Sequence, residues 1–103
     1  MKIQKYEKNQ EFLPHYDYLE GIENQRIKTF IIYLNKLNKK DGGHTIFNYY
    51  KYKIQPKTGL AICFSNTDDK FNVNNLTMHQ GEKIKTDKEK YILTIWIRKN
   101  KMY

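Results

Sequence analysis

The stretch IENQRIKTFIIYLNKLNKK, residues 22–40, decides the predicted fold because it carries the clearest apolar pattern of helical spacing in the chain. The apolar residues with this spacing are Ile27, Phe30, Ile31, Leu34 and Leu37. Positions i, i+3, i+4, i+7 and i+10 fall on one face of a helix. Lysines crowd the last turn, where cations complement the helix dipole. Asp41-Gly42-Gly43 follows as a stop signal. The sequence therefore predicts one amphipathic helix around residues 22–40.

The pattern changes from a period of 3.6 to a period of 2 after Gly43, which predicts strands. The predicted strands are HTIFNYYKYKI (44–54), LAICFSN (60–66), FNVNNLTMH (71–79) and YILTIWIRK (91–99), separated by turns at 55–59 and 66–70. The fold class that follows is α+β, with the helix packed on an antiparallel meander of about four strands. We expect a single small domain over residues 1–103, in which residues 1–11 form an edge strand or a mobile arm.

The composition indicates a folded basic protein. Nineteen Lys and Arg face eleven Asp and Glu, a formal net charge of +8, and aromatic residues make up 15% of the chain. A basic surface favours polyanionic partners, although an AT-rich genome that enriches Lys, Asn and Ile explains the charge equally well. The single cysteine, Cys63, excludes an internal disulfide. No segment has the length and apolarity of a membrane span or a signal peptide, so we expect a cytoplasmic protein with no membrane partner.

Alternation along the predicted strands sorts their side chains into a core face and a reverse face. Ile46, Tyr50, Tyr52 and Ile54 share one face of the first strand, and Tyr91, Leu93, Ile95 and Ile97 share one face of the last. We assign these apolar faces to the core under the helix. The reverse faces carry the candidate binding residues Phe47, Tyr49, Lys51, Lys53, Trp96 and Arg98, to which the basic segment adds Lys83 and Lys85. Aromatic rings beside cations suit single-stranded nucleic acid, whose bases stack while phosphates meet the cations. Alternatively, residues 12–19 cover this face as a second small core.

Few residues point to catalytic or metal chemistry. The three histidines, His15, His44 and His79, lie far apart and none has a partner four residues away. Cys63 lies mid-strand, where a small buried thiol is expected rather than a nucleophile. Asp68-Asp69 reads as a solvated turn. We therefore predict no catalytic residues, no metal and no cofactor.

Three functions remain open. The first is a small non-enzymatic binding module that engages nucleic acid or a nucleic-acid-binding protein. The second is a phage- or mobile-element-type inhibitor or adaptor that binds a host protein through the same aromatic residues. The third is a metal-free endoribonuclease, because the chain resembles the small RNase toxins of toxin–antitoxin pairs in size, basicity and helix-then-meander order. That resemblance implies a pool of functional residues comprising His44, Tyr49, Lys51, Lys53, His79 and Arg98. The sequence favours binding over catalysis and leaves the oligomeric state open.

Overall fold

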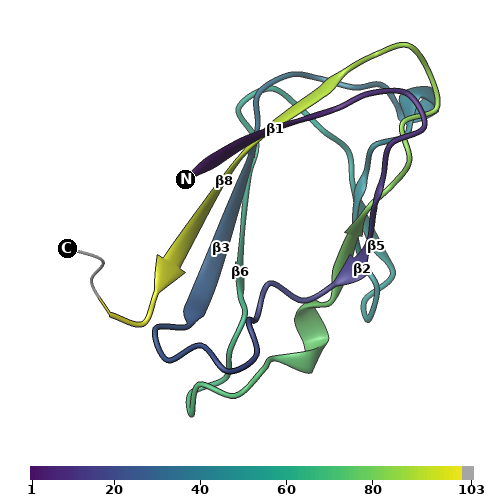
Figure 1. Ribbon diagram of the computed structural model, residues 1–103. Coiled ribbons are helices and arrows are strands. Elements are labelled where there is room, and N and C mark those ends of the chain that lie inside the picture. The colour runs from purple at the N-terminus through teal and green to yellow at the C-terminus, as the bar shows by residue number, and fades with distance from the viewer. Residues whose placement is uncertain (101–103) are drawn as a thin grey trace.

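The computed structural model describes residues 1–100, and its regular structure is almost entirely β-strand, arranged as two facing antiparallel sheets (Figure 1). The first sheet contains, in spatial order, β1 (Lys2–Tyr6), β8 (Lys90–Arg98), β3 (Arg26–Tyr33) and β6 (Ala61–Ser65). The second contains β2 (Phe12–His15), β7 (His79–Gly81), β4 (Thr45–Phe47) and β5 (Tyr52–Ile54). Two short 3-10 turns, η1 (Lys39–Asp41) and η2 (Asn75–Thr77), complete the elements. No helix in this range has the length and apolarity that crossing a membrane requires.

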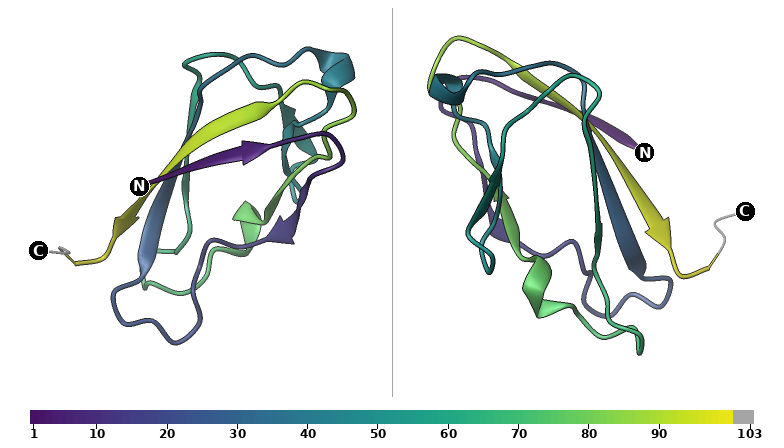
Figure 2. Two further views of the ribbon diagram at one scale, coloured as in Figure 1. Left: turned by 45° about the horizontal axis from the view of Figure 1, so that its top comes forward. Right: turned by 180° about the vertical axis from the view of Figure 1, so that it is seen from behind.

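Strands distant in sequence pair within each sheet. β1 pairs with β8, β2 with β7, and β3 with both β6 and β8. Eight antiparallel strands distributed over two sheets in this way form a jelly roll, which closes a core between its sheets. Figure 2 shows the two sheets splayed around the space between them. β1 lies at the edge of the first sheet and contributes side chains to that space.

The predicted helix over residues 22–40 is wrong, and so is the α+β fold class built on it. Residues 26–33 form β3, an interior strand of the first sheet, and no α-helix occurs among residues 1–100. The segment RIKTFIIY is rich in β-branched and aromatic residues, which favour strands. Its inward side chains, Thr29, Ile31 and Tyr33, are buried, while Phe30 and Ile32 on the outer face are partly covered. An apolar run on both faces of a strand reproduces helical spacing by coincidence.

The predicted continuous strand over residues 44–54 is a hairpin. β4 and β5 pair with Phe47 opposite Tyr52, and the intervening residues form a turn in which Lys51 has a φ of +54°. The turn reverses the expected faces, because Phe47 is buried whereas Tyr50 and Tyr52 are exposed. The assignment of Ile46, Tyr50 and Tyr52 to the core is therefore wrong.

The strands predicted near residues 60–66 and 91–99 are confirmed as β6 and β8. The face assigned to β8 is wrong, however. Ile92 and Thr94 point into the molecule and are buried, whereas Ile97 on the opposite face is exposed. The segment 71–79 is mostly irregular and contains η2, and only His79 begins a strand.

The core lies between the sheets and joins them. Its buried cluster consists of Ile31, Tyr33, Phe47, Phe64 and Ile92. Phe47 and Phe64 meet edge to face across the sheets, with ring centroids 5.1 Å apart. The hydroxyl of Tyr33 on β3 also hydrogen-bonds to the hydroxyl of Thr45 on β4. Burial raises the pKa of this tyrosine to about 12, so its hydroxyl stays protonated and keeps the sheets connected.

Gly42, after η1, provides a test of close packing in this fold. Its φ is +73°, and a Cβ atom would collide with the backbone carbonyl oxygen of Lys83. Gly59 has a similar φ of +82° but nothing within 4 Å of the equivalent atom. Gly59→Ala should cost about 1–2 kcal/mol from backbone strain alone, and Gly42→Ala should cost about 1–3 kcal/mol more. Thermal unfolding of both variants checks this, and equal melting temperatures would contradict the packing argument.

Candidate metal centre

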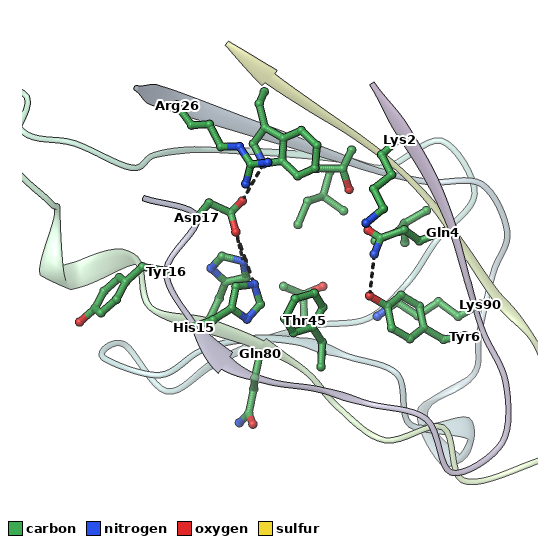
Figure 3. A pocket seen from close by; sticks show the side chains of 17 residues that line it. Lys2, Gln4, Tyr6, His15, Tyr16, Asp17, Arg26, Thr45, Gln80 and Lys90 are labelled. Carbon is green, nitrogen blue, oxygen red and sulfur yellow. Dashed lines mark hydrogen bonds and ion pairs between the residues drawn. The ribbon is translucent and has the colours of Figure 1, made fainter. Parts of the chain in front are cut away.

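A cavity of about 320 Å³ opens between the two sheets, and polar and charged side chains form much of its lining. Strands from both sheets line it, among them β1, β2, β7 and β8. Figure 3 shows Arg26 and Asp17 at one side of this cavity and Tyr6 and Lys90 at the other, with Thr45 between them. The cavity therefore has two chemically distinct ends.

His15, Asp17 and His79 converge at the first end. The Oδ1 atom of Asp17 lies 3.4 Å from Nε2 of His15 and 3.5 Å from Nε2 of His79. One ligating atom from each residue lies within 4.8 Å of the others. β2 ends at His15, so Asp17 follows two residues later on the same side of the chain. His79 begins β7, the strand paired with β2, and the register places it directly opposite His15.

The hydrogen bonds of both histidines leave their Nε2 atoms facing Oδ1 of Asp17. Nδ1 of His15 lies 2.7 Å from the carbonyl oxygen of Leu13, and Nδ1 of His79 lies 2.9 Å from that of Thr77. A carbonyl only accepts, so Nδ1 must carry the proton, and in the neutral ring Nε2 holds a lone pair. Two lone pairs and a carboxylate oxygen then face one another. This donor set fits a divalent metal, and two histidines with one carboxylate are the ligands of non-haem Fe(II).

Surrounding side chains fix the orientation of Asp17. Its Oδ2 atom accepts hydrogen bonds from the hydroxyl of Thr29 at 2.7 Å and from Nε1 of Trp96 at 3.2 Å. Burial acts to raise the pKa of Asp17, but its contacts with the His15 and His79 rings and the hydrogen bond from Thr29 hold that pKa well below its usual range. Asp17 is therefore ionised with Oδ1 left for a metal, the arrangement that outer hydrogen bonds typically produce around metal ligands.

Aromatic rings hold the histidines in place. Phe12 stacks on His15 with ring centroids 3.9 Å apart, and Phe64 packs against His79 at 4.8 Å. His79 is only 4% exposed. The ligand geometry is therefore set by the folded core and does not depend on a bound ion.

Lys90 occupies the other end of the cavity as a buried cation. It is 4% exposed, and its Nζ atom lies 5.3 Å above the ring of Tyr6. It forms no ion pair with any residue between 1 and 100. Burial lowers its pKa to about 8 against the opposing field of Glu82. A buried charge without a partner is costly, so this end of the cavity suits a ligand that brings a carboxylate.

The binding residues proposed from the sequence do not gather on one face. Phe47 is buried in the core, and Tyr49 and Lys51 lie in the exposed β4–β5 turn. Two of the exposed lysines pair with acidic neighbours: Lys53 with Glu82 at 3.5 Å and Lys83 with Glu11 at 3.7 Å. Lys85 is exposed in the loop before β8. Only Trp96 lines the cavity, with Arg98 at the end of the same strand.

The sequence pattern did not single out Asp17, and it offered Lys90 only as one of several lysines for a nucleic-acid partner. Metal-binding histidines on a helix are expected four residues apart, whereas His15-Tyr16-Asp17 has the two-residue spacing that puts ligands on one side of an extended chain. That short His-x-Asp signal, combined with a later histidine, could have pointed to the site. Lys90 gives no such signal, because nothing distinguishes it from the other lysines until the fold buries it.

Comparisons with known proteins agree with this donor set. Residues 1–98 match the 2OG-Fe(II) oxygenase superfamily. The chain is 35% identical over 114 residues to a putative prolyl 4-hydroxylase of Acanthamoeba polyphaga mimivirus, an alignment that covers 98% of the chain and 45% of that protein. It is 28% identical over 120 residues to probable prolyl 4-hydroxylase 7 of Arabidopsis thaliana, covering 94% of the chain and 37% of that protein. The chain thus spans less than half the length of these relatives.

Solved structures show the same similarity. The viral collagen prolyl hydroxylase vCPH from Paramecium bursaria Chlorella virus-1, in its 2OG complex, superimposes with a TM-score of 0.87 at 33% identity. The match covers 96% of the chain and 57% of that structure. A prolyl 4-hydroxylase from Phytophthora capsici matches with a TM-score of 0.72 at 25% identity, over 93% of the chain and 30% of that structure.

These findings overturn the functions expected from the sequence. A non-enzymatic nucleic-acid-binding module, a phage-type inhibitor and a metal-free ribonuclease are all wrong, because the family and its structural neighbours are oxygenases related to prolyl 4-hydroxylases. The aromatic and basic residues that motivated those functions are divided between core, turn and cavity. From its fold, its His–Asp–His cluster and these matches, the chain belongs to the 2OG-Fe(II) oxygenase superfamily.

Proposed function

We propose that the chain carries the catalytic site of an Fe(II)- and 2-oxoglutarate-dependent prolyl hydroxylase. The observation that carries this proposal is the presence, in one cavity, of a His–Asp–His cluster and a buried, unpaired lysine. A metal site alone would serve many reactions. A metal site facing a buried ammonium group fits a cosubstrate that chelates metal at one end and carries a carboxylate at the other.

The metal would be held by Nε2 of His15, Oδ1 of Asp17 and Nε2 of His79, which leaves the cavity side open for other ligands. Bound Fe(II) supplies the redox chemistry by which O₂ and 2-oxoglutarate convert a C–H bond to C–OH, with release of succinate and CO₂. Thr29 and Trp96 keep Asp17 aligned throughout, because both donate to its other oxygen.

Lys90 would bind the distal carboxylate of 2-oxoglutarate. Its ammonium group is already desolvated, so pairing with a carboxylate recovers interaction energy without a further burial cost for the lysine. Thr45 and Tyr6 line the same part of the cavity and offer hydroxyl groups. Gly81 leaves room there, because a Cβ atom at this position would lie 3.7 Å from Nζ of Lys90.

A prolyl residue in a peptide is the proposed substrate. The supporting evidence is the naming of the mimivirus and plant relatives as prolyl 4-hydroxylases and of the similar viral structure as a collagen prolyl hydroxylase. The test is incubation of the protein with Fe(II), 2-oxoglutarate, O₂ and proline-containing peptides, followed by mass spectrometry. We expect one added oxygen atom per modified proline and an equal amount of succinate. Succinate without peptide oxidation would support the oxygenase chemistry and contradict the prolyl substrate.

Affinity for 2-oxoglutarate should fall at alkaline pH. The carboxylates of the ligand are ionised throughout the neutral and alkaline range, so the titrating group is Lys90, whose pKa is about 8. Below that pH Lys90 is charged and affinity is constant; above it, affinity declines by about tenfold per pH unit. Calorimetric titration of the Mn(II)-loaded protein from about pH 6.5 to about pH 9.5 measures this. In Lys90→Arg the cation persists, so the decline should disappear; its persistence would assign the titration to another group.

A further inference from the structure

Arg26 lies at the metal end of the cavity, and its guanidinium group has no ion-pair partner among residues 1–100. It begins β3, where the register with β8 shifts between Arg26 and Lys28. Such a bulge redirects side chains, and Arg26 lines the cavity. Its guanidinium carbon lies 3.9 Å from the centroid of the Trp96 ring. Its Nε atom is buried without a hydrogen-bond partner.

The surroundings of Arg26 provide no free carboxylate. Within residues 1–100 neither Arg26 nor Arg98, its partner across the strands, forms an ion pair. Burial and the charge of Arg98 lower the pKa of Arg26, and only Asp17 acts to raise it. Oδ2 of Asp17 is engaged by Thr29 and Trp96, and Oδ1 faces the Nε2 atoms of the two histidines at the metal site. The guanidinium group is therefore held in position and partly desolvated, but it is not neutralised.

With a divalent metal and 2-oxoglutarate bound, the cavity would still carry excess positive charge, which favours the binding of a further anion. Lys2, Arg26 and Lys90 line the cavity, and Asp17 is the only acidic residue among its lining. A divalent metal adds two positive charges, and a 2-oxoglutarate dianion cancels two. The remaining excess is positive, and Lys90 is then satisfied by the cosubstrate. Arg26 is left without a counter-charge at the metal end of the cavity, whereas Lys2 lies at the same end as Lys90 (Figure 3).

We propose that Arg26, held flat on Trp96 and backed by Arg98, binds a carboxylate side chain of the substrate, so that this chain prefers a proline with Asp or Glu beside it. This inference rests on the proposed function. An arginine fork binds a carboxylate through two parallel hydrogen bonds, and stacking on Trp96 fixes its plane beforehand. Trp96 also touches Asp17, so the fork lies within one side chain of the metal ligands. An acidic residue next to the reacting proline would reach it.

The test compares two pairs of peptides. The members of a pair differ only in Glu or Gln beside a central proline, and this residue precedes the proline in one pair and follows it in the other. The protein is loaded with Mn(II) and 2-oxoglutarate without O₂, so that binding is measured without turnover. Calorimetry gives the dissociation constants. The fluorescence of Trp96, the only tryptophan in the sequence, reports peptide binding next to Arg26, because the two side chains are stacked. In at least one pair the Glu peptide should bind about tenfold more tightly or better.

Substitutions locate the effect. Arg26→Gln should remove the preference for Glu, and Arg26→Lys should restore only part of it, because lysine keeps the charge without the fork. Lys28→Gln is the matched control: it removes the same charge two residues along β3, where the side chain is exposed and bonded to Ser65. This variant should keep the full preference.

The outcomes separate this inference from the proposed function. Equal binding of Glu and Gln peptides in both pairs by the unmodified protein overturns the acidic preference, whatever the variants do. Failure of every peptide to bind the loaded protein also overturns it. Failure of the protein to bind Mn(II) or 2-oxoglutarate instead overturns the proposed function. Retention of the preference in Arg26→Gln would assign the acid to another cation.

Discussion

His15→Ala is expected to abolish hydroxylation and to weaken metal binding by more than about 100-fold. Even outer hydrogen-bond partners of metal ligands contribute about 10–100-fold to affinity, and His15 supplies one of only three protein ligands in this cluster. The loss is measured directly by titrating the protein with Co(II) or Mn(II) and following absorbance or calorimetric heat. Activity with Fe(II) should vanish in parallel.

His44→Ala is the matched control for this prediction. His44 is as buried as a ligand, at 8% exposure, but its Nδ1 atom bonds to Glu82 at 2.6 Å and the residue does not line the cavity. The variant should bind metal normally, although losing the Glu82 contact should lower its melting temperature. Equal losses of metal affinity in the two variants would show that the site is not the one formed by His15, Asp17 and His79.

Lys90→Met is expected to reduce affinity for 2-oxoglutarate by about 30- to 1,000-fold, which corresponds to about 2–4 kcal/mol. The variant leaves the ligand carboxylate in a desolvated cavity without a counter-charge. Metal binding should be unchanged, because Lys90 lies at the opposite end of the cavity. Calorimetric titration of the metal-loaded protein with 2-oxoglutarate measures the loss.

The stability of Lys90→Met distinguishes lost recognition from lost folding. Removing a buried, unpaired charge should leave the free energy of unfolding unchanged or increase it. Lys85→Met, at an exposed lysine in the preceding loop, should affect neither stability nor affinity strongly. A destabilised Lys90→Met protein with normal affinity in its folded fraction would contradict a binding role.

Strands whose apolar residues alternate with small or polar ones were predictable from the sequence. In β6 the exposed Ala61 and Cys63 alternate with the partly buried Ile62 and the buried Phe64, and the predicted strand is confirmed, although the expectation of a buried Cys63 thiol is wrong. β3 was not, because its outer face is nearly as apolar as its inner face, and a two-sided apolar run satisfies both the helical and the strand period. The short turn between β4 and β5 was also missed, since it contains neither Gly nor Pro.

The metal centre depends on contacts that local patterns do not contain. His15 and His79 are brought together by the pairing of β2 with β7, and their registers are fixed only by the complete fold. Alternation correctly placed Trp96 and Thr94 on the same face of β8. That face was taken as the outer one, however, and in the structure it points inward. Alternation divides the side chains of a strand into two sets, but a strand with apolar residues on both sides does not reveal which set faces the core.

β1 lies at the edge of the first sheet and forms part of the cavity wall next to Lys90, so its pairing affects how well that end of the cavity is closed. Among the described strands β1 pairs only with β8, and its last residue, Tyr6, is paired directly with Lys90. Detaching this strand would open the wall beside the buried ammonium group to water. A carboxylate bound at Lys90 therefore stabilises the closed wall, and by reciprocity any contact that holds β1 in place raises affinity for that carboxylate. Under the proposed function, pairing of the edge strand β1 and binding of the cosubstrate at Lys90 would therefore be coupled.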